Sequence, residues 1–197
     1  MPPYDRAQTT KRIFDAAVQE FAAEGIAGAR VDRIAAMADS NKAQIYNYFG
    51  NKEKLFAKVL QHRLTDLADA VTLDSSRVDE YIGELFDFMT ANPDVLRLVQ
   101  HEAAHFSITE VPERQARMAH YQEKVDVVSA AQRDGSVDET LDPSFVVMSL
   151  VSLVSWFVAA PQITEMIIGK PDDPNLRAKY RSHLVTMARR MLTPDSC

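Results

Sequence analysis

The spacing of apolar and polar residues predicts helices along most of the chain, starting near the N-terminus. Between residues 9 and 24 the apolar side chains recur at three- and four-residue intervals, as on one face of a helix: Ile13, Phe14, Ala17, Val18 and Phe21. Thr9 or Thr10 can cap the start of this helix with its hydroxyl, and Glu24 stands near its end. We expect Gly25 to end the helix, since glycine adopts a left-handed conformation without strain.

Two short helices are expected next, joined by a tight turn. The first fits Val31–Ala38 and the second Lys42–Phe49, with an Asp-Ser-Asn turn between them. Asp and Asn tolerate left-handed backbone geometry and bond their own backbone, and Asn41 can cap the second of these helices. After a Gly-Asn break, a fourth helix is expected to start at Lys52 and to continue through Val71.

The rest of the chain carries further helical patterns after a polar link at residues 73–79. Helices fit the ranges Tyr81–Asn92, Pro93–Phe106, Pro112–Arg133, Pro143–Ala160 and Pro174–Leu192. Four of them begin with proline, which costs nothing at a helix start because the first N–H groups have no intrahelical partner. Only six glycines occur in 197 residues, which also favours helices over turn-rich sheets. The predicted fold class is therefore all-α.

The second and third helices, braced by the first, form a helix-turn-helix unit. The third is short enough to enter the major groove of DNA, and we expect it to expose Lys42, Ala43, Gln44, Tyr46 and Asn47. Amide side chains such as Gln44 and Asn47 can make paired hydrogen bonds to adenine edges. Tyr46, Tyr48 and Lys52 can reach phosphates. The alternative is a small bundle whose Tyr and Phe residues only fill a core, but that would not require lysines at these offsets.

One segment resembles a known family. Residues 42–56, K-A-Q-I-Y-N-Y-F-G-N-K-E-K-L-F, are similar to the pattern K-x-x-L/I-Y-x-Y-F-x-x-K-E-x-L-F of the TetR family of repressors, and the similarity extends from about Thr10 to Leu60. The resemblance implies an N-terminal three-helix DNA-binding domain, residues 4–51. It also implies a C-terminal helical bundle for ligand binding and dimerisation, residues 52–197, in which residues 52–72 form the connecting helix.

The resemblance also assigns roles to residues. It implies that Lys42, Tyr46 and Lys52 contact phosphates and that Ala43, Gln44 and Asn47 face bases. Three positions depart from the family pattern: Asp39 replaces the usual turn glycine, Ser40 replaces a small apolar residue, and Arg30 replaces a Ser or Thr helix cap. Asp and Ser keep the turn feasible. Arg30 gives up the cap but could reach a phosphate, so we include it among the DNA-binding residues.

Charge permits DNA binding without indicating it strongly. The net charge is −6, yet residues 1–60 hold nine Lys or Arg against seven Asp or Glu, a balance of +2 that leaves −8 for the remainder. This excess is well short of a strongly basic patch. The only cysteine is Cys197, and residues 1–6 lack the pattern of a signal peptide, so we expect a cytoplasmic protein. The uncharged stretch Pro143–Thr164 is short for a membrane span and is interrupted by serines, so we expect a core helix there and no membrane association.

A rival function is suggested by the sequence His101-Glu102-Ala103-Ala104-His105. This H-E-x-x-H spacing places two imidazoles on one helical face, where they can bind zinc while the Glu acts as a general base. A zinc-dependent hydrolase also needs a third protein ligand. No H-x-x-G-x-x-H continuation follows, and Glu123 is the only tempting distant ligand. We therefore predict no metal, no cofactor and no enzymatic activity, and expect the two histidines to serve structure or effector recognition.

Aromatic, methionine and histidine residues of the second part could line a pocket for an apolar effector. The candidates are Phe86, Met89, His101, His105, Phe106, Met118, Tyr121, Met148, Ser152 and Trp156. In the family the last two helices pair with their copies in a dimer. Stripes on these helices suit that role, and the predicted interface residues are Ser149, Ser155, Tyr180, Leu184, Met187 and Met191.

These features lead to one functional expectation. The chain is expected to be a homodimeric transcriptional regulator that binds a near-palindromic operator in double-stranded DNA and is released by a small-molecule effector. Repression, as opposed to activation, rests on the resemblance alone. A helical interaction module without DNA binding is a further alternative, and it would show no salt-dependent binding to any duplex.

Overall fold

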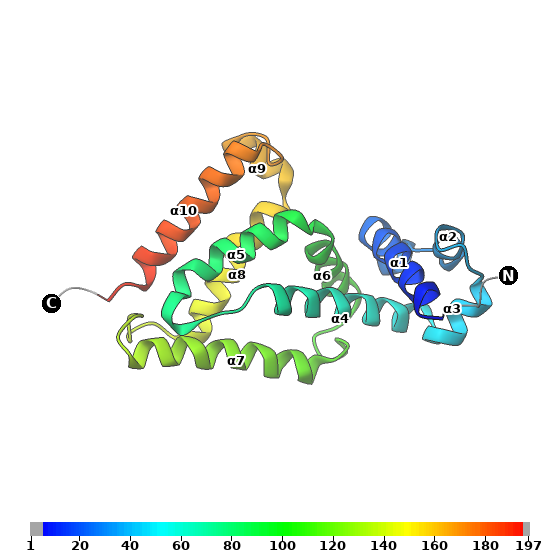
Figure 1. The fold of residues 1–197 in the computed structure, drawn as a ribbon, viewed down its shortest axis with the longest axis horizontal. Coiled ribbons are helices and arrows are strands. Elements are labelled where there is room, and N and C mark those ends of the chain that lie inside the picture. Colours follow the sequence, from blue (N-terminus) through cyan, green and yellow to red (C-terminus); the bar gives the residue numbers. More distant parts are fainter. Residues whose placement is uncertain (1–5, 195–197) are drawn as a thin grey trace. The chain divides into compact units, whose positions relative to one another are not determined.

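The computed structural model describes residues 6–194, which form α-helices and one short 3-10 helix without any strand (Figure 1). The predicted domain start at residue 4 and the lone Cys197 lie outside the described residues. The elements in chain order are α1 (Arg6–Gly28), α2 (Val31–Met37), α3 (Lys42–Phe49), α4 (Lys52–Ala70), η1 (Ser75–Arg77), α5 (Val78–Ala91), α6 (Pro93–His105), α7 (Arg114–Arg133), α8 (Pro143–Ala159), α9 (Pro161–Ile168) and α10 (Pro174–Leu192).

The chain divides into two compact units. The first consists of Met1–Asp66 with Asp94–Arg114, and the second of Leu67–Pro93 with Gln115–Cys197. These bounds differ from the predicted division at residue 51, because most of α4 and nearly all of α6 belong to the first unit, with Leu98 of α6 in its core. The division of DNA binding and effector binding between residues 4–51 and 52–197 stays a prediction.

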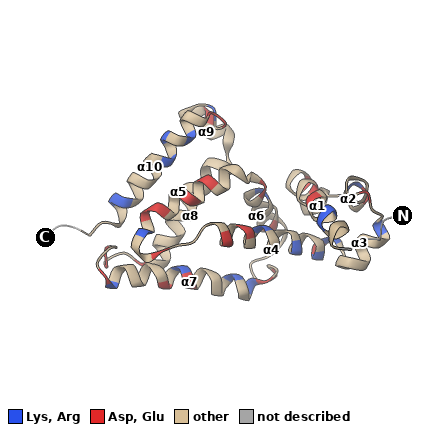
Figure 2. Ribbon diagram, in the orientation of Figure 1, with Lys and Arg blue, Asp and Glu red and all other residues tan. Residues whose placement is uncertain are grey.

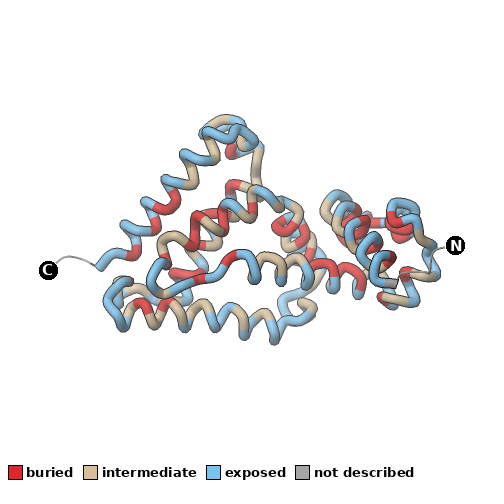
Figure 3. The backbone as a smooth tube through the Cα atoms, viewed as in Figure 1, coloured by how far each residue is buried: buried red, intermediate tan, exposed pale blue. Residues whose placement is uncertain are grey.

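The core of the first unit is built from the apolar faces that the sequence pattern predicts (Figure 3). Its buried side chains come from five helices and include Ile13, Phe21, Ile34, Ile45, Phe49, Phe56, Val59 and Leu98. Aromatic rings meet edge to face within it, with centroids 5.2 Å apart for Phe21 and Phe56 and 5.5 Å apart for Phe14 and Phe49. Such packing fixes α3 against α1 through Ile45 and Phe49, which leaves the opposite side of α3 uncovered.

Two polar contacts tie α6 into the first unit. Arg63 of α4 donates from Nε to Oδ2 of Asp94 at 2.8 Å and from Nη2 to Oδ1 at 3.3 Å. The guanidinium also donates to Asp66 at 2.9 Å. The ring of His101 packs against Gly25 of α1, with its Nε2 lying 3.4 Å from the carbonyl oxygen of Ala22. The first helices and α6 therefore form one packed body.

In the second unit, α5 packs against α8 and α10. The rings of Phe86, Phe157 and Tyr180 form a cluster, with centroids 5.0 Å apart for Phe86 and Phe157 and 4.9 Å apart for Phe157 and Tyr180. Gly83 lies where α5 approaches α10, and a Cβ atom there would meet Arg181 at 2.9 Å. The close approach of these two helices thus depends on a residue without a side chain at position 83.

Several helix ends and two whole elements differ from the prediction. The first helix starts by Arg6, so Thr9 is not its cap but a buried residue within it. Regular helix is interrupted at Gly25, as predicted, but its φ of 67° and ψ of −178° are not the expected left-handed conformation, and one more turn follows to Gly28. The elements η1 and α9 were not predicted. In α9, Pro161 starts a new helix inside an apolar stretch, and the Thr164 hydroxyl donates to the Phe157 carbonyl at 3.1 Å.

By length and hydropathy, no single helix between residues 6 and 194 could span a membrane. The pair α8 and α9 meets these criteria only when both are taken together, and it is bent by 89°.

Candidate nucleic-acid interface

The turn between α2 and α3 has the backbone geometry that its sequence requires. Asp39 adopts a positive φ of 47°, which Asp tolerates better than most residues. The Ser40 N–H donates to the Ala35 carbonyl at 2.9 Å, so the turn closes the end of α2. The carboxylate of Asp39 lies 3.3 Å from Nη1 of Arg12. Asp39, which stands where the family usually has glycine, therefore keeps the turn intact, as predicted.

The start of α3 is fixed by a side-chain cap. Asn41 has an extended backbone, and its Oδ1 accepts a hydrogen bond from the Gln44 N–H at 2.8 Å, as the sequence predicts. The helix runs from Lys42 to Phe49, with the predicted bounds. Gly50, at φ 84°, ends it. A second Asn cap then opens α4, where Asn51 accepts from the Lys54 N–H at 2.8 Å.

The outer side of α3 carries the side chains that were predicted to meet DNA. Lys42, Ala43, Tyr46 and Asn47 are exposed, whereas Gln44 and Tyr48 are half-buried. Gln44 is held by its neighbour Ser40, whose hydroxyl donates to Oε1 at 2.8 Å. Tyr48 packs its ring edge-on against Phe49 at 6.2 Å. Four of the six predicted residues on this helix thus lie open to a ligand, and two are braced by the protein.

Arg30 precedes α2 and makes no side-chain cap, as expected from the loss of Ser or Thr. Its guanidinium pairs with Asp32 at 2.8 Å, and this hydrogen bond holds the pKa of the Asp32 carboxyl below its usual range. The backbone N–H of Arg30 donates to Oε1 of Glu20 at 2.8 Å. A phosphate at Arg30 would therefore have to share the guanidinium with Asp32.

Glu20 is a site residue that the sequence analysis missed. It is buried on α1, and its Oε1 accepts from the Arg30 N–H and lies 3.0 Å from Nε of Arg33. This one carboxylate therefore connects α1 to both the start and the body of α2. No sequence signal identifies it, since its partners lie ten and thirteen residues away.

Lys52 makes an intramolecular contact that the sequence did not predict. Its ammonium donates to the carbonyl oxygens of Ala27 and Ala29, each at 3.2 Å, and the residue is half-buried. It therefore stabilises the end of α1 from the start of α4. An ammonium has three N–H donors, so one remains for a phosphate.

Basic residues gather on the first half of α4, which carries Lys52, Lys54 and Lys58 (Figure 2). The ammonium of Lys58 also lies 5.7 Å from the ring centroid of Phe49. Together with Lys42 these lysines give the first unit cations on the two helices that flank the Gly50 break.

The H-E-x-x-H residues of α6 occupy three different environments. His101 is half-buried against α1, Glu102 is buried, and His105 is exposed with its ring 4.8 Å from that of Phe106. Among residues 6–194 there is no group of three or more His, Cys, Asp or Glu placed to hold a metal ion. The geometry therefore gives the zinc hydrolase alternative no support.

The predicted effector residues divide between the two units. His101, His105 and Phe106 belong to the first, and Phe106 packs beside its core. In the second unit, Phe86 and Met89 are buried, whereas Met118 and Tyr121 are exposed on α7. The predicted pocket side chains Met148, Ser152 and Trp156 lie on an exposed face of α8, with Trp156 61% exposed. Within a single chain these three residues lie at the surface, and their assignment to an effector pocket stays a prediction.

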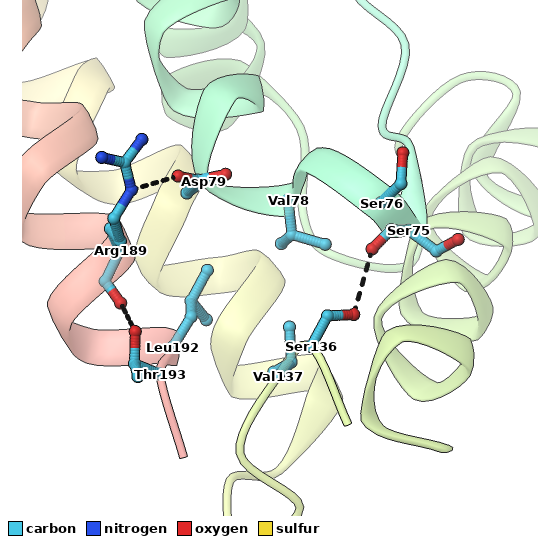
Figure 4. A pocket seen from close by; sticks show the side chains of 9 residues that line it. All are labelled: Ser75, Ser76, Val78, Asp79, Ser136, Val137, Arg189, Leu192 and Thr193. Atoms are coloured by element: carbon cyan, nitrogen blue, oxygen red, sulfur yellow. Dashed lines mark hydrogen bonds and ion pairs between the residues drawn. The ribbon is translucent and has the colours of Figure 1, made fainter. Parts of the chain in front are cut away.

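A small open pocket in the second unit has different walls (Figure 4). It is lined by Ser75, Ser76, Val78, Asp79, Ser136, Val137, Arg189, Leu192 and Thr193, none of them a predicted effector residue. Its one cation, Arg189, already pairs with Asp79 at 2.8 Å and lies 3.7 Å from Glu80. The pocket therefore offers a ligand no unbalanced charge.

The predicted dimer residues are mostly accessible. Met187 and Met191 are exposed on α10, and Ser149, Ser155 and Tyr180 are half-buried. Leu184 is a correction, because it is only 1% exposed within a single chain and so belongs to the protomer's own core. On α8 the exposed Phe145 and Met148 extend the apolar surface.

Comparisons with known proteins agree with this arrangement. Residues 13–59 match the family model for bacterial regulatory proteins of the tetR family, and residues 77–190 match the model for a Tetracyclin repressor-like C-terminal domain. The chain is 40% identical over 172 residues to the HTH-type transcriptional repressor SCO4008 of Streptomyces coelicolor, which covers 87% of this chain and 90% of that protein.

Solved structures share the fold. The putative transcriptional regulator SCO4942 of Streptomyces coelicolor superimposes with a TM-score of 0.82 at 35% identity, covering 93% of this chain and 98% of that one. The regulator FadR of Bacillus subtilis, solved in complex with stearoyl-CoA, superimposes with a TM-score of 0.68 at 16% identity and covers 93% and 99% of the two chains. The second similarity concerns the fold alone.

Proposed function

Because the chain belongs to the TetR family of DNA-binding transcriptional regulators, we propose that it is a homodimeric repressor that a small-molecule effector releases from its operator. The observation that carries this proposal is the two-sided character of α3. Ile45 and Phe49 anchor the helix in the core, while Lys42, Tyr46 and Asn47 stand exposed on it. A short helix held in this way can enter a major groove with its side chains already positioned.

The predicted DNA-binding residues, exposed or half-buried, divide two tasks in this proposal. Asn47 and Gln44 read base edges through their amides, and Ala43 packs against a base. Lys42, Tyr46 and Lys52 bind phosphates, which position the helix without carrying sequence information. Arg30 and Tyr48 join the phosphate contacts from either side of the turn.

Dimerisation sets the spacing of the two recognition helices. In a symmetric dimer two copies of α3 would meet half-sites one DNA turn apart, roughly 34–36 Å, on a near-palindromic operator. The exposed apolar residues of α8 and α10, among them Trp156, Met187 and Met191, support a dimer contact because isolated monomers rarely leave such patches open.

The effector acts through the second unit. It shifts the equilibrium toward a dimer that no longer fits the operator, and only by its differential affinity for the two states. The protein acts in the cytoplasm and performs no catalysis.

Genome-wide capture of DNA bound in the source organism tests this function. The expected result is a small set of sites with two similar inverted half-sites, protected together in footprints by the purified chain. Uniform recovery of DNA without such a motif would contradict sequence-specific regulation.

A further inference from the structure

A lysine on α7 lies in an unusual environment in the second unit. Lys124 is half-buried, and its Nζ lies 5.0 Å from the ring centroid of Tyr81, a residue of α5 that is 4% exposed. Within residues 6–194, no carboxylate lies at ion-pair distance from this ammonium and no hydrogen-bond acceptor is seen for it. Burial lowers the pKa of Lys124, which means that its surroundings disfavour the charged form.

The nearest acidic side chain does not compensate for this burial. Glu123 raises the pKa of Lys124 less than burial lowers it. Its Oε2 lies instead 3.8 Å from Nδ1 of His120. The face of Tyr81 attracts a cation but provides no acceptor for the three N–H donors of an ammonium. No carboxylate among the described residues therefore neutralises the ammonium of Lys124, which is available to an anion from outside the chain.

Two tyrosines lie near Lys124: Tyr81, whose ring faces the ammonium, and Tyr121, which acts on Tyr81. Burial raises the pKa of Tyr81 to about 12, and the nearby Tyr121 adds to this effect. Tyr81 is therefore protonated at neutral pH and can donate a hydrogen bond. Tyr121 lies on the same helix as Lys124, about one turn before it. One ammonium and two hydroxyl donors form the set of groups that recognises a carboxylate.

The surface of α7 beside this cluster carries both apolar and charged side chains. Met118 is 54% exposed and Tyr121 is 45% exposed, and the two are three residues apart on α7, so they are neighbours on its surface. Figure 2 shows Lys and Arg at several positions along this helix. A ligand with an apolar body and an anionic end would place its body against Met118 and its anionic end at Lys124.

We propose that the effector is an organic acid whose carboxylate is bound by the ammonium of Lys124, with Tyr81 and Tyr121 as further donors and Met118 against the apolar body. This assignment rests on the proposed effector response and names its chemical class. It uses two of the predicted pocket residues, Met118 and Tyr121 of α7.

The test is calorimetric titration of the full chain, without DNA, with three acids and their neutral amides: benzoate and benzamide, phenylacetate and phenylacetamide, hexanoate and hexanamide. At least one acid is expected to bind at least about tenfold more tightly than its amide, as for a hydrogen-bonded ion pair. Lys124→Gln is expected to remove this preference, and Lys124→Arg to retain most of it. The matched control is Lys179→Gln, which changes an exposed lysine of α10 and is expected to have no effect.

Two further variants keep the result interpretable. Lys124→Met fills the same space without a charge and is expected to behave like Lys124→Gln, so a folding defect of one variant does not decide the outcome. Tyr121→Phe is expected to weaken acid binding severalfold and amide binding less, because a hydrogen bond to a charged acceptor is the stronger of the two. Equal binding of every acid and its amide, or a preference that survives in both Lys124 variants, would overturn the proposal. Operator binding is measured separately, so its failure would count against the repressor function and not against the acid site.

Discussion

Gly25 and His101 are packed so closely that a Cβ atom on Gly25 would lie 2.8 Å from Nδ1 of the His101 ring. Gly25 also has a φ of 67° and a ψ of −178°, a region almost restricted to glycine that costs other residues about 1–3 kcal/mol. The contact joins α1, which braces the helix-turn-helix, to α6, and both helices belong to the first unit. It gives the first histidine of the H-E-x-x-H sequence a structural role.

Replacing this glycine is therefore expected to destabilise the first unit. Gly25→Ala is expected to lower the free energy of unfolding by about 2 kcal/mol or more, from backbone strain and from the clash with the imidazole. Urea denaturation measures the change. Gly28→Ala is the matched control, since its Cβ would meet Glu24 at an ordinary 3.5 Å. The double variant Gly25→Ala, His101→Ala is expected to relieve the clash but not the strain, and an unchanged stability of Gly25→Ala would contradict the contact.

Lys52→Ala is expected to affect both DNA binding and stability. Loss of a phosphate contact is expected to weaken binding about equally for all sequences and to reduce the salt slope by about one unit. Loss of the hydrogen bonds to Ala27 and Ala29 is expected to cost about 1 kcal/mol of folding free energy. Mobility shifts in increasing salt and urea denaturation separate the two effects. Lys54→Ala is the control for stability. An unchanged salt slope in Lys52→Ala would show that Lys52 makes no phosphate contact.

Leu184 and Met187 are expected to respond differently to a charge, although both lie on α10. Leu184→Glu places a carboxylate in the core of the protomer and is expected to cost about 4 kcal/mol or more, giving unfolded protein. Met187→Glu changes an exposed residue and is expected to give a folded monomer. Circular dichroism with light scattering distinguishes these results. A folded dimer in the Met187 variant would argue against the proposed interface.

Tyr81 is expected to make stability depend on pH in the alkaline range. Its folded pKa is about 12, against about 10 when unfolded, so both states hold the proton below pH 10 and the tyrosine then has no effect on the pH dependence. Between about pH 10 and 12 only the unfolded state loses the proton, and folding stability is expected to fall by about 2–3 kcal/mol. Urea denaturation at several pH values tests this. In Tyr81→Phe the free energy of unfolding is expected to fall less over this pH range, by the same amount of about 2–3 kcal/mol. An identical pH dependence of stability in both proteins would contradict the burial of the hydroxyl.

The parts of the fold that could be predicted have strong local signals. The bounds of α3 and α10 are as predicted, because Asn41 and Pro174 mark their starts within the sequence itself. The start of α9 was missed, since Pro161 falls within a continuous apolar stretch and the contact of Thr164 with Phe157 is seen only in the fold.

The candidate sites show the same limit. Apolar periodicity finds a stripe but not whether the same chain covers it, so Leu184 was assigned to a dimer contact although its own protomer buries it. The internal contacts of Lys52 and the role of Glu20 depend on partners far along the chain. No local pattern could have revealed them.

The central claim is that α3 reads a specific DNA sequence. Fluorescence anisotropy with a duplex recovered by genome-wide capture, and with the same duplex shuffled, tests it most directly. The recovered duplex is expected to bind at least about a thousandfold more tightly. In Asn47→Ala this ratio is expected to shrink by a factor that corresponds to about 1–3 kcal/mol. Equal affinity of the wild-type chain for both duplexes would contradict the account.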